Sequence, residues 1–147
     1  MILKEDNYKD KISALAAKDW QPLFDLIPVI RNTSHYRETI CDEQDDKGVT
    51  YLPYSIEEPI VSRFRETAYS LSIIIDFNWG SWEEGRNMAR DEQFDYDTID
   101  IPTKCKIITA IVRNDRFCDG ALCSAFESGL ILRILQSIER QVRGINR

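Results

Sequence analysis

Apolar residues recur along much of the chain at the three- and four-residue spacing that places side chains on one face of an α-helix. The pattern is clearest near the C-terminus, at Ile131, Ile134, Leu135, Ile138 and Val142. Arg140 and Arg143 lie in the last turns of this segment, where cations interact favourably with the negative end of a helix. We therefore predict a final helix with one buried apolar face.

The first thirty residues predict two short helices. The first has Tyr8, Ile12 and Leu15 on one face and ends near Ala17. The second follows Asp19, whose side chain is suited to cap a helix N-terminus. Its apolar positions are Leu23, Phe24, Ile27 and Ile30. Pro28 should end or kink this helix, because proline lacks a backbone donor and clashes with the preceding turn.

Periodicity disappears in residues 31–53, which include the acidic, turn-rich stretch from Cys41 to Gly48. We predict that residues 31–53 form an exposed loop. A structureless connection of this length is uncommon in a compact domain, so a short hairpin around Lys47 and Gly48 is the alternative.

The next segment predicts a long helix. Ser55 and Glu58 have the spacing of a capping box, and Pro59 suits the first turn of the helix. The apolar stripe that follows is Ile60, Phe64, Ala68, Leu71 and Ile75. The β-branched run from Ile73 to Ile75 fits either a buried last turn or a short strand.

Three further helix starts follow, with Asn78, Asp100 and Asp119 as candidate N-caps. The second of these helices carries Ile101, Cys105, Ile108 and Val112 on one face, and the third contains Leu122, Ala125 and Phe126. Gly129 is placed to end the third helix in a left-handed conformation. We predict an all-α single domain over residues 1–147 with about seven helices. An α+β fold is the alternative if residues 73–77 pair with the long loop.

Length and composition agree with one globular domain. The chain has 147 residues, of which 43% are hydrophobic and 30% charged. Its first eighteen residues contain no apolar run as long as a signal peptide or a membrane span requires. Without an export signal the four cysteines should remain reduced thiols, so we expect a cytoplasmic protein with no membrane contact.

The formal net charge of −6 argues against general nucleic-acid binding, which normally requires a basic face. The charge is uneven, with sixteen acidic and five basic residues from Glu38 to Asp100, and four acidic and eight basic residues from Ile101 to Arg147. This asymmetry suits a homo-oligomer or a charged protein partner. Solvated helix faces are the simpler interpretation.

The run from Ile108 to Gly120 reads ITAIVRNDRFCDG, and Phe126-Glu127-Ser128-Gly129 follows it. Together with the upstream segment FNWGSW, from Phe77 to Trp82, it resembles an uncharacterised bacterial family known only as a domain of unknown function. The resemblance rests on that family's VRxDRFxEG, FExG and FDWPxW-like patterns. Asn78, Gly80 and Asp119 replace the Asp, Pro and Glu of those patterns. The resemblance implies that the chain is related to this family. Because the family has no known activity, the resemblance does not indicate a function.

The loop Arg113–Gly120 is the best candidate site, because it concentrates guanidinium and carboxylate groups between two apolar helices. Two arginines beside a helix N-terminus suit an anion, and nearby carboxylates suit acid–base work. The structural interpretation is that Arg113 and Arg116 pair with Asp115, Asp119 or Glu127 and fix the angle between the helices. The candidate ligand or partner residues are Arg113, Asp115, Arg116, Phe117, Asp119, Gly120, Glu127, Trp79 and Trp82.

Trp79 and Trp82 fit either an aromatic wall for a ligand or simple core packing. No cofactor motif is present, and the single histidine, His35, and the scattered cysteines do not have metal-site or catalytic spacing. We therefore expect a binding or interaction domain without catalysis. The alternative is an enzyme that acts on an anionic small molecule through the loop Arg113–Gly120.

Overall fold

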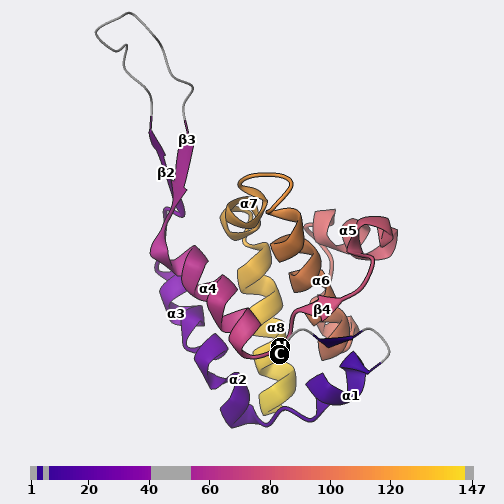
Figure 1. Ribbon diagram of the computed structural model, residues 1–147. Helices are drawn as coiled ribbons and strands as arrows, with labels where there is room; N and C mark the ends of the chain where they lie inside the picture. The colour runs from indigo at the N-terminus through magenta and orange to yellow at the C-terminus, as the bar shows by residue number, and fades with distance from the viewer. Residues whose placement is uncertain (1–2, 5–6, 41–53, 145–147) are drawn as a thin grey trace, which may run out of the picture.

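The predicted all-α fold is confirmed by a computed structural model, which describes residues 3–4, 7–40 and 54–144 (Figure 1). Its α-helices are α1 (Tyr8–Ser13), α2 (Ala17–Phe24), α3 (Leu26–Arg31), α4 (Pro59–Ser70), α5 (Glu83–Arg90), α6 (Ile101–Asn114), α7 (Ala121–Glu127) and α8 (Leu130–Arg143). Two 3-10 helices, η1 (Trp79–Ser81) and η2 (Tyr96–Thr98), lie in the connections. The strands are β1 (Leu3–Lys4), β2 (Arg37–Ile40), β3 (Tyr54–Glu57) and β4 (Ile75–Asp76).

Helix α8 lies at the centre of the bundle and packs against α2, α3, α6 and α7 (Figure 1). The predicted apolar face is its buried face, since Ile131, Ile134, Leu135 and Ile138 are fully buried. Gly129 has a positive φ of 82°, as predicted for a left-handed helix end, and α7 and α8 meet there at a bend of 70°. In the described ranges no single helix combines the length and the apolar character needed to cross a membrane.

The prediction of a continuous exposed loop over residues 31–53 is wrong at its start. Arg31 ends α3, and Arg37–Ile40 form β2, which pairs antiparallel with β3. The hairpin of β2 and β3 extends away from the helices (Figure 1). The predicted turn around Lys47 and Gly48 lies outside the described residues.

The predicted capping box at Ser55 is also wrong, because Ser55 is part of β3 and α4 begins at Pro59 after Glu58. The cross-strand partner Thr39 holds Ser55 in extended conformation, and this pairing overrides the local capping signal. The β-branched residues after α4 are fully buried, and Ile75 pairs in parallel with Leu3 rather than with the long loop.

Several local predictions at helix ends also need correction. Ala16 is the N-cap of α2, and its N–H donates to the Asp19 carboxylate three residues later. The chain breaks at Asp25 between α2 and α3, so that Pro28 falls in the first turn of α3, where a missing donor costs little. Trp82, and not Asn78, precedes α5. The prediction for Asp100 is confirmed, since its carboxylate accepts from the Thr103 N–H at 2.9 Å.

Candidate functional site

The structure separates the predicted site residues into two groups on either side of α6. Asp115, Asp119, Gly120 and Glu127 lie beside the base of the hairpin. Trp79 and Trp82 line a pocket between α5 and α6 on the other side. Each group also contains arginines from outside the candidate residues: Arg37 and Arg65 in the first, and Arg86 and Arg90 in the second.

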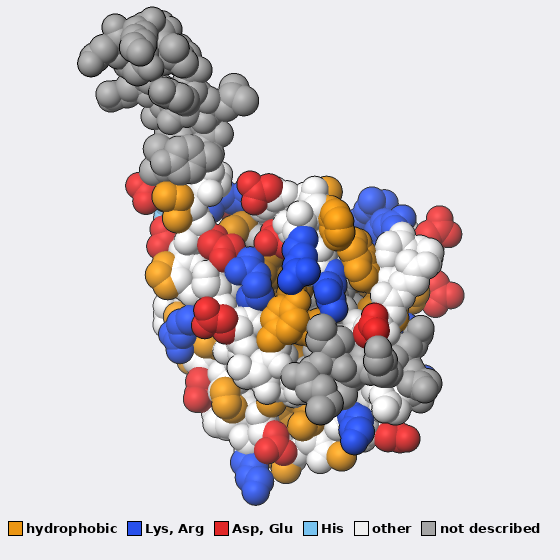
Figure 2. Space-filling model, viewed as in Figure 1, with side chains coloured by type: hydrophobic (Ala, Val, Ile, Leu, Met, Phe, Trp, Pro, Cys, Tyr) orange, Lys and Arg blue, Asp and Glu red, His pale blue; other side chains and the backbone are white. Residues whose placement is uncertain are grey.

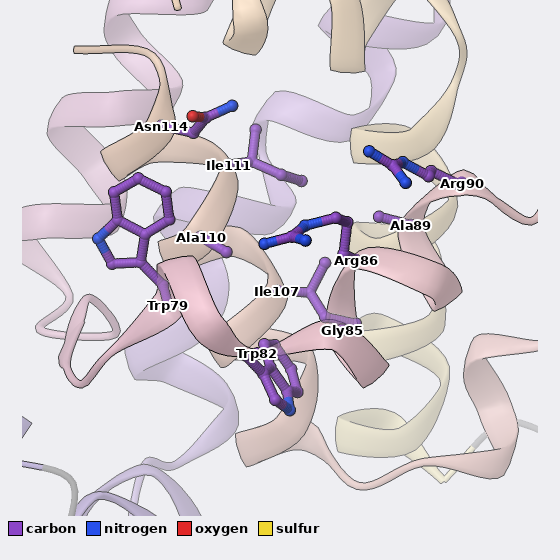
Figure 3. Close-up of a pocket in the computed structure, with 10 residues that line it drawn as sticks. All are labelled: Trp79, Trp82, Gly85, Arg86, Ala89, Arg90, Ile107, Ala110, Ile111 and Asn114. Carbon is purple, nitrogen blue, oxygen red and sulfur yellow. The ribbon is translucent and has the colours of Figure 1, made fainter. Parts of the chain in front are cut away.

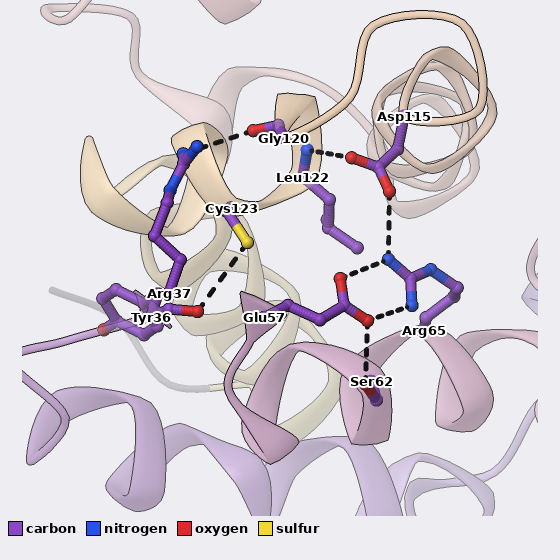
Figure 4. A network of polar contacts seen from close by, with 9 residues as sticks. All are labelled: Tyr36, Arg37, Glu57, Ser62, Arg65, Asp115, Gly120, Leu122 and Cys123. Atoms are coloured by element: carbon purple, nitrogen blue, oxygen red, sulfur yellow. Dashed lines mark hydrogen bonds and ion pairs between the residues drawn. The ribbon is translucent and has the colours of Figure 1, made fainter. Parts of the chain in front are cut away.

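In the first group, Arg65 on α4 connects two carboxylates (Figure 4). Its guanidinium donates to Glu57 at 2.6 and 2.9 Å and to Asp115 at 3.0 Å. Ser62 also donates to Glu57, at 2.8 Å. The hydrogen bonds from Arg65 hold the pKa of Glu57 below its usual value. The second oxygen of Asp115 accepts from the N–H of Leu122 and thereby caps α7.

Arg37 on β2 fastens the hairpin to α7. Its guanidinium donates to both oxygens of Glu127, at 3.0 and 2.7 Å, and to Ser124 at 3.0 Å. A further bond reaches the carbonyl of Gly120 at 3.3 Å. Gly120 has a φ of 88°, and a Cβ there would lie 2.7 Å from Nη1 of Arg37. Glycine at this position therefore satisfies both the backbone conformation and the close approach of the arginine.

The predicted pairing of Arg113 and Arg116 with Asp115, Asp119 or Glu127 is wrong. Asp115 and Glu127 instead pair with Arg65 and Arg37, and in the described part of the chain Arg113 and Arg116 form no ion pair. The predicted cap is displaced as well, because Asp115 caps α7 in place of Asp119. Arg37 and Arg65 approach the loop from distant segments, so no local sequence signal identifies them.

The second group forms a pocket of about 290 Å³, which we call the Trp79 pocket (Figure 3). Its apolar floor consists of Ile107, Ala110 and Ile111, which share one face of α6. Its remaining lining residues are Trp79, Trp82, Gly85, Arg86, Ala89, Arg90 and Asn114. No carboxylate, histidine or cysteine is among the described residues that line it.

The two arginines of the Trp79 pocket are held by α5, where they stand one turn apart. The guanidinium of Arg86 points into the pocket and donates to the carbonyl of Gly80 at 2.6 Å (Figure 3). Within the described ranges neither Arg86 nor Arg90 forms an ion pair. Their charges are therefore available to a ligand. The four-residue spacing of Arg86 and Arg90 places them on one face of α5, but nothing in the sequence shows that this face lines a pocket.

Trp82 is fixed by tight packing on α5 and α6. A Cβ at Gly85 would lie 2.2 Å from the Trp82 ring, so only glycine lets the ring rest on the helix backbone. The ammonium of Lys106 lies 4.8 Å from the centre of the Trp82 ring and 4.4 Å from that of Phe77, within cation–π distance. The structure therefore gives Trp82 a supporting role at the base of the pocket.

Trp79 is partly buried, and its ring pairs with that of Phe117. The two ring centres are 5.9 Å apart with a tilt of 36°. Phe117 is 76% exposed, which makes it the most exposed large hydrophobic residue in the described ranges. Lys and Arg side chains and hydrophobic side chains intermingle on the face seen in Figure 2. The aromatic pair thus extends the wall of the Trp79 pocket onto the molecular surface.

Comparison with known proteins identifies a family for this chain. No curated protein and no solved structure matches the chain. A model of a family of unknown function, DUF6508, matches residues 15–144, which include α2 to α8 and both groups of candidate residues. The chain therefore belongs to the DUF6508 family of unknown function.

Proposed function

We propose that this protein is a non-catalytic binding domain, and that its Trp79 pocket binds a small ligand with an apolar part and an anionic group. The observation that supports this most is the composition of the pocket. An apolar floor on α6 faces two arginines on α5, and no described lining residue carries a negative charge. Mostly apolar pockets with a few polar groups are the usual form of ligand sites.

The residues that line the pocket favour binding over catalysis. Its described lining residues include no carboxylate, imidazole or thiol that would act as a nucleophile or general base. The enzyme alternative uses the loop Arg113–Gly120, but two of its acid–base candidates, Asp115 and Glu127, are hydrogen-bonded to arginines. Both carboxylates are therefore already engaged within the fold, by Arg65 and Arg37, and are not free to contact a ligand.

A protein partner or a second copy of the chain is the second candidate function. Phe117 supports it, because aromatic residues are enriched at protein interfaces and this one is 76% exposed. We also propose a bacterial, cytoplasmic protein. Buried Cys105 and Cys123 and exposed Cys118 all carry free thiols, which agrees with a reducing compartment.

Titration with anilinonaphthalene sulfonate, an apolar anion whose fluorescence rises in apolar sites, tests the ligand proposal. We expect saturable binding to one site, with energy transfer from tryptophan. The double variant Arg86→Ala/Arg90→Ala should bind the dye at least about tenfold more weakly, because two charge-assisted contacts are lost. Sedimentation velocity on the same samples records whether binding occurs on a monomer or an oligomer.

The matched control is Arg31→Ala/Arg63→Ala, which removes the same charge from exposed positions on α3 and α4 outside the pocket. This control should bind the dye as the unaltered protein does. Equal affinity in all three proteins, or no saturable binding in any, would contradict the assignment of the Trp79 pocket.

A further inference from the structure

We infer that the ligand of the Trp79 pocket is a nucleoside monophosphate, with its base on the Trp79 indole and its phosphate between Arg86 and Arg90. This inference rests on the proposed function, since it names the ligand class of the same pocket. Three features of the pocket support this ligand class: its aromatic wall, its two arginines and its volume.

The aromatic wall of the Trp79 pocket favours a ligand that contains a planar aromatic ring. Trp79 lines the pocket and is only partly buried, and its ring pairs with that of Phe117, a residue that is 76% exposed. Phe117 does not itself line the pocket, but its ring continues the aromatic surface of Trp79 toward solvent. Aromatic side chains bind nucleobases by stacking, because every base has a π-face. The pair therefore suits a flat, aromatic ligand.

A phosphate monoester is favoured over a carboxylate by the two arginines. Arg86 and Arg90 occupy consecutive turns of α5 and both line the pocket. The bond from Arg86 to the Gly80 carbonyl directs the guanidinium inward and leaves its other N–H groups for a ligand. A phosphate monoester carries nearly two negative charges and three acceptor oxygens, which match two guanidiniums. A carboxylate supplies one charge and two oxygens.

The volume of the pocket and the side chain of Asn114 are consistent with one bound nucleotide. A volume of about 290 Å³ is at the small end for ligand pockets, so it suits a ligand no larger than one mononucleotide. Asn114 lies beside Trp79 at the opposite end of the pocket from Arg90 (Figure 3). Its amide offers both a donor and an acceptor, which is what the edge of a base requires. The apolar floor of α6 between these ends would lie under the sugar.

Calorimetric titration of the full chain with adenosine monophosphate, adenosine and inorganic phosphate tests this inference. Adenosine monophosphate should bind at least about tenfold more tightly than either fragment, and it should displace anilinonaphthalene sulfonate. Arg86→Ala/Arg90→Ala should weaken the nucleotide at least about tenfold and leave adenosine unchanged. Trp79→Leu should weaken the nucleotide and adenosine by the same factor. Arg31→Ala/Arg63→Ala is again the control.

A matched pair of ligands, naphthyl phosphate and naphthoate, separates the anion from the ring. We expect the phosphate to bind more tightly, and equal affinity would overturn the role given to the two arginines. If the dye binds but adenosine monophosphate does not, the nucleotide inference is wrong while the proposed function stands. If neither binds, both are wrong.

Discussion

At the scale of single residues, the Asp115 carboxylate joins three elements. One oxygen accepts from Arg65 on α4 and the other from the Leu122 N–H at the start of α7, while Asp115 itself follows α6. Only 17% of its side chain is exposed, so solvent screens these bonds weakly. Asp119, four residues later, is exposed and accepts no hydrogen bond within the described residues.

Replacing these two aspartates should therefore have different effects. Asp115→Ala leaves the half-buried guanidinium of Arg65 with one partner and removes the α7 cap, so it should lower the free energy of unfolding by about 1–3 kcal/mol. Asp119→Ala should change it by no more than about 0.5 kcal/mol. Equilibrium unfolding in urea measures both. A larger loss for Asp119→Ala would restore the cap assigned from sequence.

At the scale of elements, α8 organises the core. Leu135 is fully buried at the middle of its apolar face. Arg133 lies off that face, yet its guanidinium donates to the Glu92 carbonyl at 3.0 Å and lies 5.4 Å from the centre of the Tyr96 ring. A prediction from position alone would give Arg133 almost no effect on stability, whereas these contacts tie α8 to η2 and to the connection before it.

Leu135→Ala should cost about 2–5 kcal/mol, since it removes apolar contacts and leaves a cavity. Arg133→Ala should cost about 1 kcal/mol, through one hydrogen bond and one cation–π contact. Arg63→Ala on the exposed face of α4 is the control, with an expected change below about 0.5 kcal/mol. Urea unfolding of the three variants should give this order. Equal losses for Leu135→Ala and Arg63→Ala would mean that another face of α8 forms the core.

At the scale of the whole molecule, Lys104 places a cation inside the packing of α6 against α8. It is fully buried and donates to the Gln141 side chain. Burial lowers the pKa of Lys104 to about 8, against the attraction of Asp97 and Asp100 and with the help of repulsion by Arg140. In the unfolded chain the pKa of the same group is about 10.4.

Stability should consequently increase with pH above about 8 on account of Lys104. Between the folded and unfolded pKa values the unfolded chain binds more protons, and the free energy of unfolding then rises with pH. Urea unfolding of the unaltered protein and of Lys104→Met from about pH 7.5 to 9.5 isolates this contribution, because Met cannot titrate. The free energy of unfolding of the unaltered protein, relative to that of Lys104→Met, should increase as pH rises. A constant difference would show that Lys104 does not titrate in this window.

Sequence by itself determined the elements that depend on neighbours within one or two turns. Helical spacing located the apolar faces of α6 and α8, Asp100 was recognised as a cap, and Gly129 as a left-handed helix end. These features depend on side chains three or four residues apart, so a local pattern contains the necessary information.

Only the tertiary structure decided which distant groups meet. Arg37 and Glu127 are 90 residues apart in sequence, Arg65 and Asp115 are 50 apart, and Leu3 pairs with Ile75. A carboxylate near several arginines bonds to the one that packing brings within reach, and this packing is a property of the whole chain. For the same reason the Trp79 pocket, made where α5 packs on α6, was not visible in the sequence of either helix.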